Sequence, residues 1–162
     1  MSVPAQYFRA GVGAVIVNGE GLVLALERAD IPGAWQLPQG GLEASEEPLQ
    51  AAFREVAEET GILECDLKIL DTSLEPIVYE LPVSARSEKT GRGQAQYWFL
   101  FRFDGSDSAI DVKHGSEFRT WKWVPFKNMV RSTADFRKCV YRHIAKQFRE
   151  HISHSSLPFS RA

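Results

Sequence analysis

The sequence predicts a mixed α/β domain in which helices cover the faces of a β-sheet. Three observations support this fold class. Strand-like and helical runs follow in the order two strands, a helix, several strands and a helix, which favours a sheet sandwiched between helices. Each helical run carries one apolar stripe and so buries one face. The 162 residues are 44% hydrophobic, which suits a single domain with a full core over residues 1–162.

The first elements are two strands joined by a tight turn. Residues 11–18 are rich in small and β-branched side chains, as expected for a strand, and residues 22–27 form the returning strand. The sequence Asn-Gly-Glu-Gly between them is a strong turn signal. A loop rich in glycine and proline then continues to Gly41.

The next element is a helix that is predicted to begin after Ser45 and to end before Gly61. Ser45 is suited to the N-cap, and the two glutamates after it lie where the helix dipole favours acids. Pro48 is tolerated this early in a helix. Gly61 is suited to the C′ position, with Ile62 as its hydrophobic contact. The core-facing stripe is predicted to consist of Leu49, Ala52, Phe53 and Val56.

Further strands and a final helix complete the chain. Strands are predicted at residues 67–70, 77–81, 97–103 and 120–124. The helix is predicted from Thr133 to about His151, because apolar residues recur in it every four positions. This stripe consists of Phe136, Val140, Ile144 and Phe148. Residues 152–162 are predicted to form a flexible tail.

Composition and charge exclude several classes of protein. The net charge is −2, so any contact with nucleic acid must come from local basic groups. The N-terminus does not resemble a signal peptide, and no apolar run approaches the ~20 residues that span a membrane. Cys65 and Cys139 form no metal-type spacing, which favours packed and reduced thiols. We therefore expect a cytoplasmic protein without a membrane partner, and the sequence indicates no stable protein partner.

Three carboxylates are crowded on one face of the predicted central helix. Glu55, Glu58 and Glu59 are neighbours because residues three and four apart share a face. Such crowding is unfavourable unless a cation lies among the carboxylates, and Mg²⁺ and Mn²⁺ prefer oxygen ligands. Arg54 can reach Glu58 one turn further on, and the glycines before the helix let a backbone carbonyl approach a metal. A solvated acidic face is the alternative interpretation of the same residues.

The wider stretch from residue 40 to residue 62 resembles the signature of the Nudix hydrolase family. This signature is Gly, five residues, Glu, seven residues, Arg-Glu, an aliphatic residue, any residue, Glu-Glu, any residue, Gly and an aliphatic residue. Its fixed positions are all matched, by Gly40, Glu46, Arg54, Glu55, Val56, Glu58, Glu59, Gly61 and Ile62. The resemblance implies a Nudix fold, with a mixed β-sheet between α-helices. It also implies hydrolysis of a phosphoanhydride bond in nucleoside-diphosphate-linked substrates.

The resemblance implies a metal centre as well. In the family, the signature carboxylates bind two or three Mg²⁺ or Mn²⁺ ions. Carried over to this sequence, the family pattern makes Glu55, Glu58 and Glu59 metal ligands, with the Gly40 carbonyl as a further ligand. Arg54 is also assigned to the catalytic residues, where it would support the loop and the helix. Metal ions would activate a bound water and neutralise the leaving phosphate, and a carboxylate, not specified by the sequence, would take the proton.

Three stretches outside the signature are similar to one subgroup of the family, which contains dinucleoside polyphosphate hydrolases and bacterial RNA pyrophosphohydrolases. They are WQLPQGG at 35–41, GQAQYWFLFRF at 93–103 and SEFRTWKWVP at 116–125. With the final helix, the likeness extends from Phe8 to Phe148. In this subgroup the Glu of the EF pair adds a carboxylate to the metal centre. Here that residue is Glu117, and an exposed loop acid is its alternative interpretation.

Four residues are predicted to bind the substrate. Arg9 matches a residue of the subgroup that meets substrate phosphate, and Arg28, just before the glycine-rich loop, can do the same because a guanidinium suits phosphate oxygens. For each of these two arginines, a solvated surface side chain is the alternative interpretation. Phe136 matches an aromatic residue that stacks on a base, although a core position at the start of the last helix explains it equally well. Tyr97 stands where the subgroup usually has lysine. A tyrosine can donate a hydrogen bond or stack on a base, but it brings no charge.

Three functional hypotheses follow. The first is hydrolysis of dinucleoside polyphosphates such as diadenosine tetraphosphate. The second is removal of pyrophosphate from triphosphorylated RNA 5′ ends, which needs the same parts, and another nucleotide substrate is a variant of both. The third is a non-catalytic nucleotide-binding module with a Nudix fold. The complete set of carboxylates argues against the third hypothesis, since degenerate modules tend to lose a signature glutamate.

Overall fold

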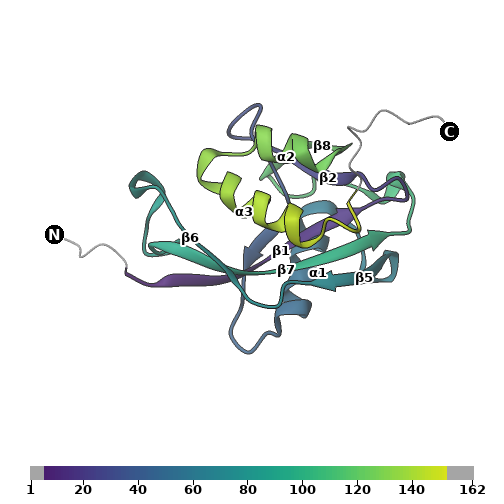
Figure 1. The fold of residues 1–162 in the computed structure, drawn as a ribbon. Coiled ribbons are helices and arrows are strands. Elements are labelled where there is room, and N and C mark those ends of the chain that lie inside the picture. The colour runs from purple at the N-terminus through teal and green to yellow at the C-terminus, as the bar shows by residue number, and fades with distance from the viewer. Residues whose placement is uncertain (1–5, 153–162) are drawn as a thin grey trace.

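The computed structural model describes residues 6–152 and confirms the predicted fold class. A mixed sheet lies between the long helix α1 (Pro48–Thr60) on one face and two helices on the other (Figure 1). These two are α2 (Phe126–Ser132) and α3 (Asp135–Gln147). Short 3₁₀ turns occur at Glu64–Asp66, Val83–Ala85 and Asp107–Ala109. Among residues 6–152, no helix is long and apolar enough to cross a membrane.

The described sheet has eight strands, and β1 lies at its centre. The strands are β1 Phe8–Val17, β2 Val23–Arg28, β3 Trp35–Gln36, β4 Gln39–Gly41, β5 Leu67–Thr72, β6 Ile77–Glu80, β7 Gly93–Phe103 and β8 Phe118–Val124. Their order is β3-β2-β1-β7-β5, and β4 pairs with β1, β6 with β7 and β8 with β2. β1 is parallel to β7 and antiparallel to β2 and β4. Residues 11–13 of β1 therefore pair both with β4 and with residues 96–98 of β7.

The predicted N-terminal hairpin is present. The Asn18 side chain closes its turn by accepting hydrogen bonds from the N–H groups of Glu20 and Leu22, at 2.9 and 3.1 Å. Gly21 has a φ of 76°, which glycine adopts without strain. β1 begins at Phe8 rather than at Gly11, because its pairing with β7 continues to that residue.

The segment predicted as a loop up to Gly41 contains two short strands, β3 and β4. β4 pairs with β1 so closely that a methyl group at Gly11 would lie 2.7 Å from the Gly40 carbonyl oxygen. Glycine is therefore needed for this approach of two backbones. Glycine and proline disfavour strands, so local propensity did not indicate this tertiary pairing.

The start of α1 differs from the prediction, whereas its end agrees with it. Ser45 is not the N-cap: it has a φ of 65°, and the helix begins after Glu47. The Gln50 side chain accepts a hydrogen bond from the Glu47 N–H at 3.4 Å, as in a capping box. Gly61 ends the helix in a left-handed conformation with a φ of 73°, and Ile62 is buried.

Two hydrophobic clusters hold the helices against the sheet. The first lies under α1 and includes the predicted stripe of that helix, with Ala52 and Val56 buried. The second lies under α2 and α3 and contains Val140, Ile144 and Phe148, as predicted for the last helix. The buried Tyr141 adds an anchor to this second cluster, because its hydroxyl accepts a hydrogen bond from the Leu37 N–H at 2.9 Å.

Several details of the second half differ from the prediction. The four predicted strands are present as β5 to β8, but the sequence did not indicate α2, and α3 is shorter than residues 133–151. Cys65 and Cys139 are exposed rather than packed. Ile152, the first residue of the predicted flexible tail, is buried in the second cluster, and the rest of that tail lies outside the described residues.

Candidate active site

The carboxylates of α1 meet the β4 strand. A methyl group at Gly40 would overlap the Glu55 carboxylate, so this carboxylate lies directly against the Gly40 backbone. Glu59 is 8% exposed and accepts a hydrogen bond from the Gln39 N–H at 3.2 Å. The side chain of Glu58 is 58% exposed. The residue pattern of the helix and the pairing of β4 with β1 together bring these groups to one place.

Arg54 ties the loop to the helix. Its guanidinium contacts the Glu46 carboxylate at 2.7 and 2.8 Å through Nε and Nη2. Nη1 donates to Glu55 at 2.8 Å and to Glu58 at 3.4 Å. Nη2 also donates to the Gly41 carbonyl at 2.9 Å. Arg54 therefore connects the loop at Gly41 and Glu46 with the carboxylates of α1, and its role as a support stays a prediction.

Replacing Arg54 with methionine is expected to lower the free energy of unfolding by about 3 kcal/mol. The reason is that the carboxylates of Glu46, Glu55 and Glu58 lose the cation that they share. Urea unfolding measures this value. Arg102 to methionine is the matched control. Its guanidinium pairs with Asp104 at 3.4 Å, and both side chains are exposed, at 43% and 58%, so a loss below about 1 kcal/mol is expected. Equal losses in the two variants would contradict the assigned support role.

Electrostatics distinguish the carboxylates of the site. The hydrogen bond from Arg54 lowers the pKa of Glu46 to about 2. Burial raises the pKa of Glu59 well above its ordinary value, and the charges of Glu117, Glu55 and Glu58 raise it further. Burial also raises the pKa of Glu55, although Arg54 opposes this effect. The negative charges at Glu55 and Glu59 are therefore incompletely compensated by the protein itself.

A pH dependence of stability follows for the metal-free protein. Between the ordinary pKa of 4.5 and the raised pKa of Glu59, the folded state keeps a proton that the unfolded state releases. The free energy of unfolding therefore falls as the pH rises through this window, by up to about 1.4 kcal/mol per pH unit. Glu59→Gln is expected to raise the Tm relative to the parent above the window but not at about pH 4. Thermal melts in a chelator test this, and a Tm difference independent of pH would refute it.

Glu117 lies in the segment just before β8. Its charge contributes to the raised pKa of both Glu59 and Glu55, which adds a further negative charge to this region. Arg28 holds it with a 3.4 Å contact from Nη1. Two further bonds of Arg28, at 2.7 and 2.8 Å, go to Asp30. The donors of Arg28 are thus engaged by carboxylates, and its contacts are those of a residue that orients Glu117.

The donor set fits a hard divalent cation. Four carboxylates and the Gly40 carbonyl are oxygen donors, which Mg²⁺ and Mn²⁺ prefer, and the raised pKa values show a need for positive charge. Within residues 6–152, no three acidic, histidine or cysteine side chains already form a closed ligand group. Arg54 instead draws Glu55 and Glu58 to itself.

Polar side chains lie beside the carboxylates on the α3 face of the sheet. A methyl group at Gly41 would overlap the Arg9 guanidinium, which therefore lies against this residue of β4. Arg9 is paired with Gln94 of β7. The next residue on the same face, Gln96, is 1% exposed and donates to Gln94 at 3.1 Å and to Gln39 at 3.4 Å. The Arg9 guanidinium therefore lies beside β4, the strand that contains Gly40.

An aromatic pair continues this polar row toward α3. Tyr79 of β6 is paired with Gln94, and its ring stacks on Phe136 with 6.3 Å between centroids. The Arg137 guanidinium lies 4.7 Å from the centroid of the Phe136 ring. Among residues 6–152, Arg137 forms no salt bridge. Neither Arg137 nor Tyr79 was predicted as a site residue from the sequence. The one sequence feature that could have indicated Arg137 is its position next to Phe136.

Tyr97 lies apart from this aromatic pair. Its side chain is half-buried and packs against the first hydrophobic cluster, on the α1 face of the sheet. Phe136 lies on the opposite face, next to residues of the second cluster. The structure therefore brings Arg9 and Phe136 to one face, whereas it places Tyr97 on the other.

Comparisons with known proteins agree with this geometry. The NUDIX domain family matches residues 7–144. An RNA pyrophosphohydrolase of Cereibacter sphaeroides is 37% identical over 151 residues, and one of Erythrobacter litoralis is 40% identical over 152. Each alignment covers 90% of this chain and 93% of the relative. A crystal structure of a C. elegans Ap4A hydrolase binary complex shares the fold, with a TM-score of 0.67 and 21% identity over 88% of this chain and 98% of that one. The chain belongs to the NUDIX family.

Proposed function

We propose that this protein is a metal-dependent pyrophosphohydrolase that removes pyrophosphate from the 5′-triphosphorylated end of RNA. The observation that carries the proposal is that Glu55 lies against Gly40 and Glu59 binds the Gln39 N–H, beside Arg9 at Gly41, in a chain 37–40% identical to RNA pyrophosphohydrolases. The complete carboxylate set argues against a non-catalytic module. We also propose that residues 1–162 form one domain that acts in the cytoplasm, where free thiols such as Cys65 and Cys139 stay reduced.

The metal ligands in this proposal are the carboxylates of Glu55, Glu58, Glu59 and Glu117 and the carbonyl of Gly40. Two or three Mg²⁺ or Mn²⁺ ions would offset the negative charge, because Arg54 is shared with Glu46. When bound, such ions activate a water for in-line attack and stabilise the charge of the leaving phosphate. One of the four carboxylates accepts the proton of the attacking water.

The remaining residues bind or position the substrate. Arg9 contacts the phosphate chain beside the Gly40–Gly41 backbone, where its guanidinium already lies. Phe136 stacks on a base, and Arg137 adds positive charge at the edge of this aromatic surface. Arg28 orients Glu117, since its donors are engaged by carboxylates. Tyr97 supports the carboxylate helix by packing beneath it.

A side-by-side turnover assay with Mg²⁺ or Mn²⁺ tests the proposal. The substrates are a short 5′-triphosphorylated RNA and diadenosine tetraphosphate, and the products of each are identified. A preference for the RNA, with release of pyrophosphate or of two phosphates, is expected. A preference for diadenosine tetraphosphate, with ATP and AMP as products, would make the protein a dinucleoside polyphosphate hydrolase instead. Metal binding without turnover of either compound would refute both assignments.

A further inference from the structure

We propose that the exposed face of α3 binds the RNA chain downstream of its 5′ end, an inference that rests on the proposed function. The surface comprises Arg142, Lys146 and Arg149 together with the hollow between α3 and the segment at residues 74–78. It would add contacts that a mononucleotide or a dinucleotide is too short to make. The substrate class would then be single-stranded RNA rather than any triphosphorylated nucleotide.

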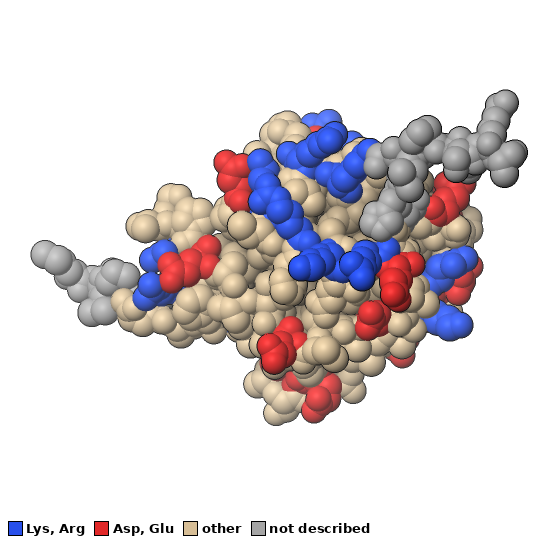
Figure 2. Space-filling model, viewed as in Figure 1, with Lys and Arg blue, Asp and Glu red and all other residues tan. Residues whose placement is uncertain are grey.

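Positive charge is concentrated in the segment that contains α2 and α3. The segment at residues 127–150 carries seven basic and two acidic residues, a formal charge of +5, in a chain whose net charge is −2. Figure 2 shows Lys and Arg side chains gathering over the region that α2 and α3 occupy in Figure 1. A local positive field of this kind attracts a polyanion even when the whole protein is slightly acidic.

Three of these basic side chains are exposed. Arg142 and Lys146 lie four residues apart, so they share one face of α3 and are about 6 Å apart along its axis, and Arg149 is exposed in the turn that follows the helix. The salt bridges of residues 6–152 engage none of the three, whereas Lys138 pairs with Asp135 at 2.7 Å. Three cations without carboxylate partners in the described chain are thus free to contact phosphates.

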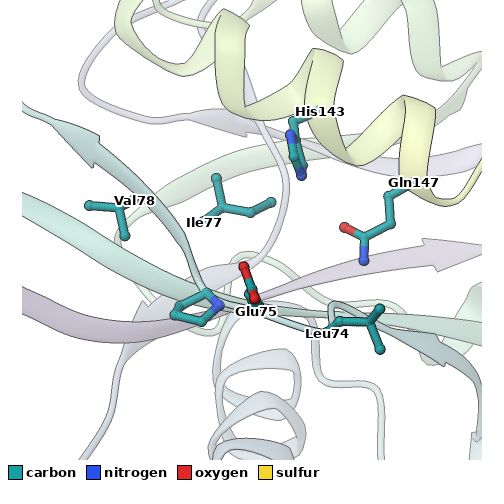
Figure 3. Close-up of a pocket in the computed structure, with 7 residues that line it drawn as sticks. Leu74, Glu75, Ile77, Val78, His143 and Gln147 are labelled. Carbon is teal, nitrogen blue, oxygen red and sulfur yellow. The ribbon is translucent and has the colours of Figure 1, made fainter.

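A hollow lies beside this basic face, between α3 and residues 74–78. It has a volume of about 470 Å³, and His143 and Gln147 project into it from α3 (Figure 3). The opposite wall includes Leu74, Ile77 and Val78 together with the carboxylate of Glu75, and Leu74 is 94% exposed. Apolar walls with a few hydrogen-bonding groups suit an unpaired base, and basic grooves with such surfaces are typical of single-strand binding.

The basic face of α3 is connected to the candidate active site through the sheet. From Glu59 a row of contacting residues passes through Gln39, Gln96 and Gln94 to Tyr79. Tyr79 stacks on Phe136, in the first turn of α3, and the basic face begins at Arg142, nearly two turns further on. Because Gln96 is 1% exposed, a strand whose 5′ end lies at the carboxylates would pass over the solvent side of this row to reach α3. This continuity favours the substrate RNA over an acidic protein as the partner.

The test compares two substrates with the full-length protein and Mg²⁺. One is an unstructured 5′-triphosphorylated RNA of about 16 nucleotides, and the other is a triphosphorylated dinucleotide. In the variant R142Q/K146Q, kcat/KM for the long RNA is expected to fall about tenfold at low salt. The slope of log kcat/KM against log salt should become shallower by about 1.4, since each phosphate contact on a single strand contributes about 0.7. The dinucleotide should be cleaved at the parental rate.

The charge-preserving variant R142K/K146R is the matched control and should keep the preference for the long RNA. Binding of a 5′-hydroxyl RNA of the same length, followed by fluorescence anisotropy, is measured in parallel and requires no hydrolysis. Weaker binding by R142Q/K146Q but not by R142K/K146R supports the surface. Equal binding and equal cleavage of the long RNA by all three proteins would overturn it and assign the basic face to another partner. Failure of the parent protein to cleave either triphosphorylated compound would instead refute the proposed function.

Discussion

Replacing Glu58 with glutamine is expected to lower kcat by a factor on the order of 10²–10⁴, the range that a group handling a proton in the reaction typically contributes. The change keeps the size of the side chain and removes one oxygen donor with its charge. Because the Glu58 side chain is 58% exposed, the variant should fold normally, with a change in unfolding free energy within about 0.5 kcal/mol. The measurement is kcat on triphosphorylated RNA, together with the rise in Tm on adding Mn²⁺.

Glu64→Gln is the matched control for this prediction. Glu64 is an exposed glutamate just after the same helix and forms no salt bridge with residues 6–152. It should retain parental kcat and the parental rise in Tm with Mn²⁺. If Glu58→Gln retained activity and metal stabilisation as well, the metal role of this carboxylate would be wrong. If it lost activity but kept the full metal response, Glu58 would act on the proton rather than on the metal.

Replacing Gly40 with alanine is expected to lower kcat/KM about 100-fold, the loss that a displacement of about 1 Å at a reacting group can cause. The added methyl group would overlap the Glu55 carboxylate, so this carboxylate must move. The carboxylate is the far end of a flexible side chain, and it can move without disturbing the backbone. The expected signature is therefore a large loss of activity with a small change in Tm.

Gly19→Ala provides the comparison for the Gly40 variant. An added methyl group there would meet only the end of the Arg102 guanidinium, at 3.4 Å. Both the activity and the Tm of this variant should stay close to the parental values. A Gly40→Ala protein with parental activity would show that the position of Glu55 against the β4 backbone is not needed for turnover. A large fall in its Tm would show that the loss arises from the fold instead.

Predictions that depended on local chemistry agreed with the structure. The turn at Asn18, the left-handed Gly61 and the apolar stripe of α1 each follow from the conformational preferences of neighbouring residues. The carboxylates of Glu55, Glu58 and Glu59 also belong to this class, since helical spacing alone makes them neighbours.

The errors arose where distant segments decide the conformation. Ser45 has the composition of an N-cap, but the helix begins two residues later, after a turn in which Arg54 holds the Glu46 side chain. β3 and β4 are strands only because β2 and β1 offer them partners. Arg28 contacts Asp30 and Glu117, two carboxylates that no local pattern of the sequence connects with it, and its predicted contact with phosphate stays a prediction.

The sequence by itself determined the fold class, the family and the helix that carries the three signature glutamates, because these depend on periodicity and on a specific pattern within 23 residues. Only the tertiary structure decided that Glu55 lies directly against Gly40, that Arg28 contacts Glu117 and that Arg137 lies over Phe136. It also placed Tyr97 and Phe136 on opposite faces of the sheet. The physical reason is that strand pairing and register connect residues that lie far apart in the chain. No local pattern of a single sequence shows which of these residues will become neighbours.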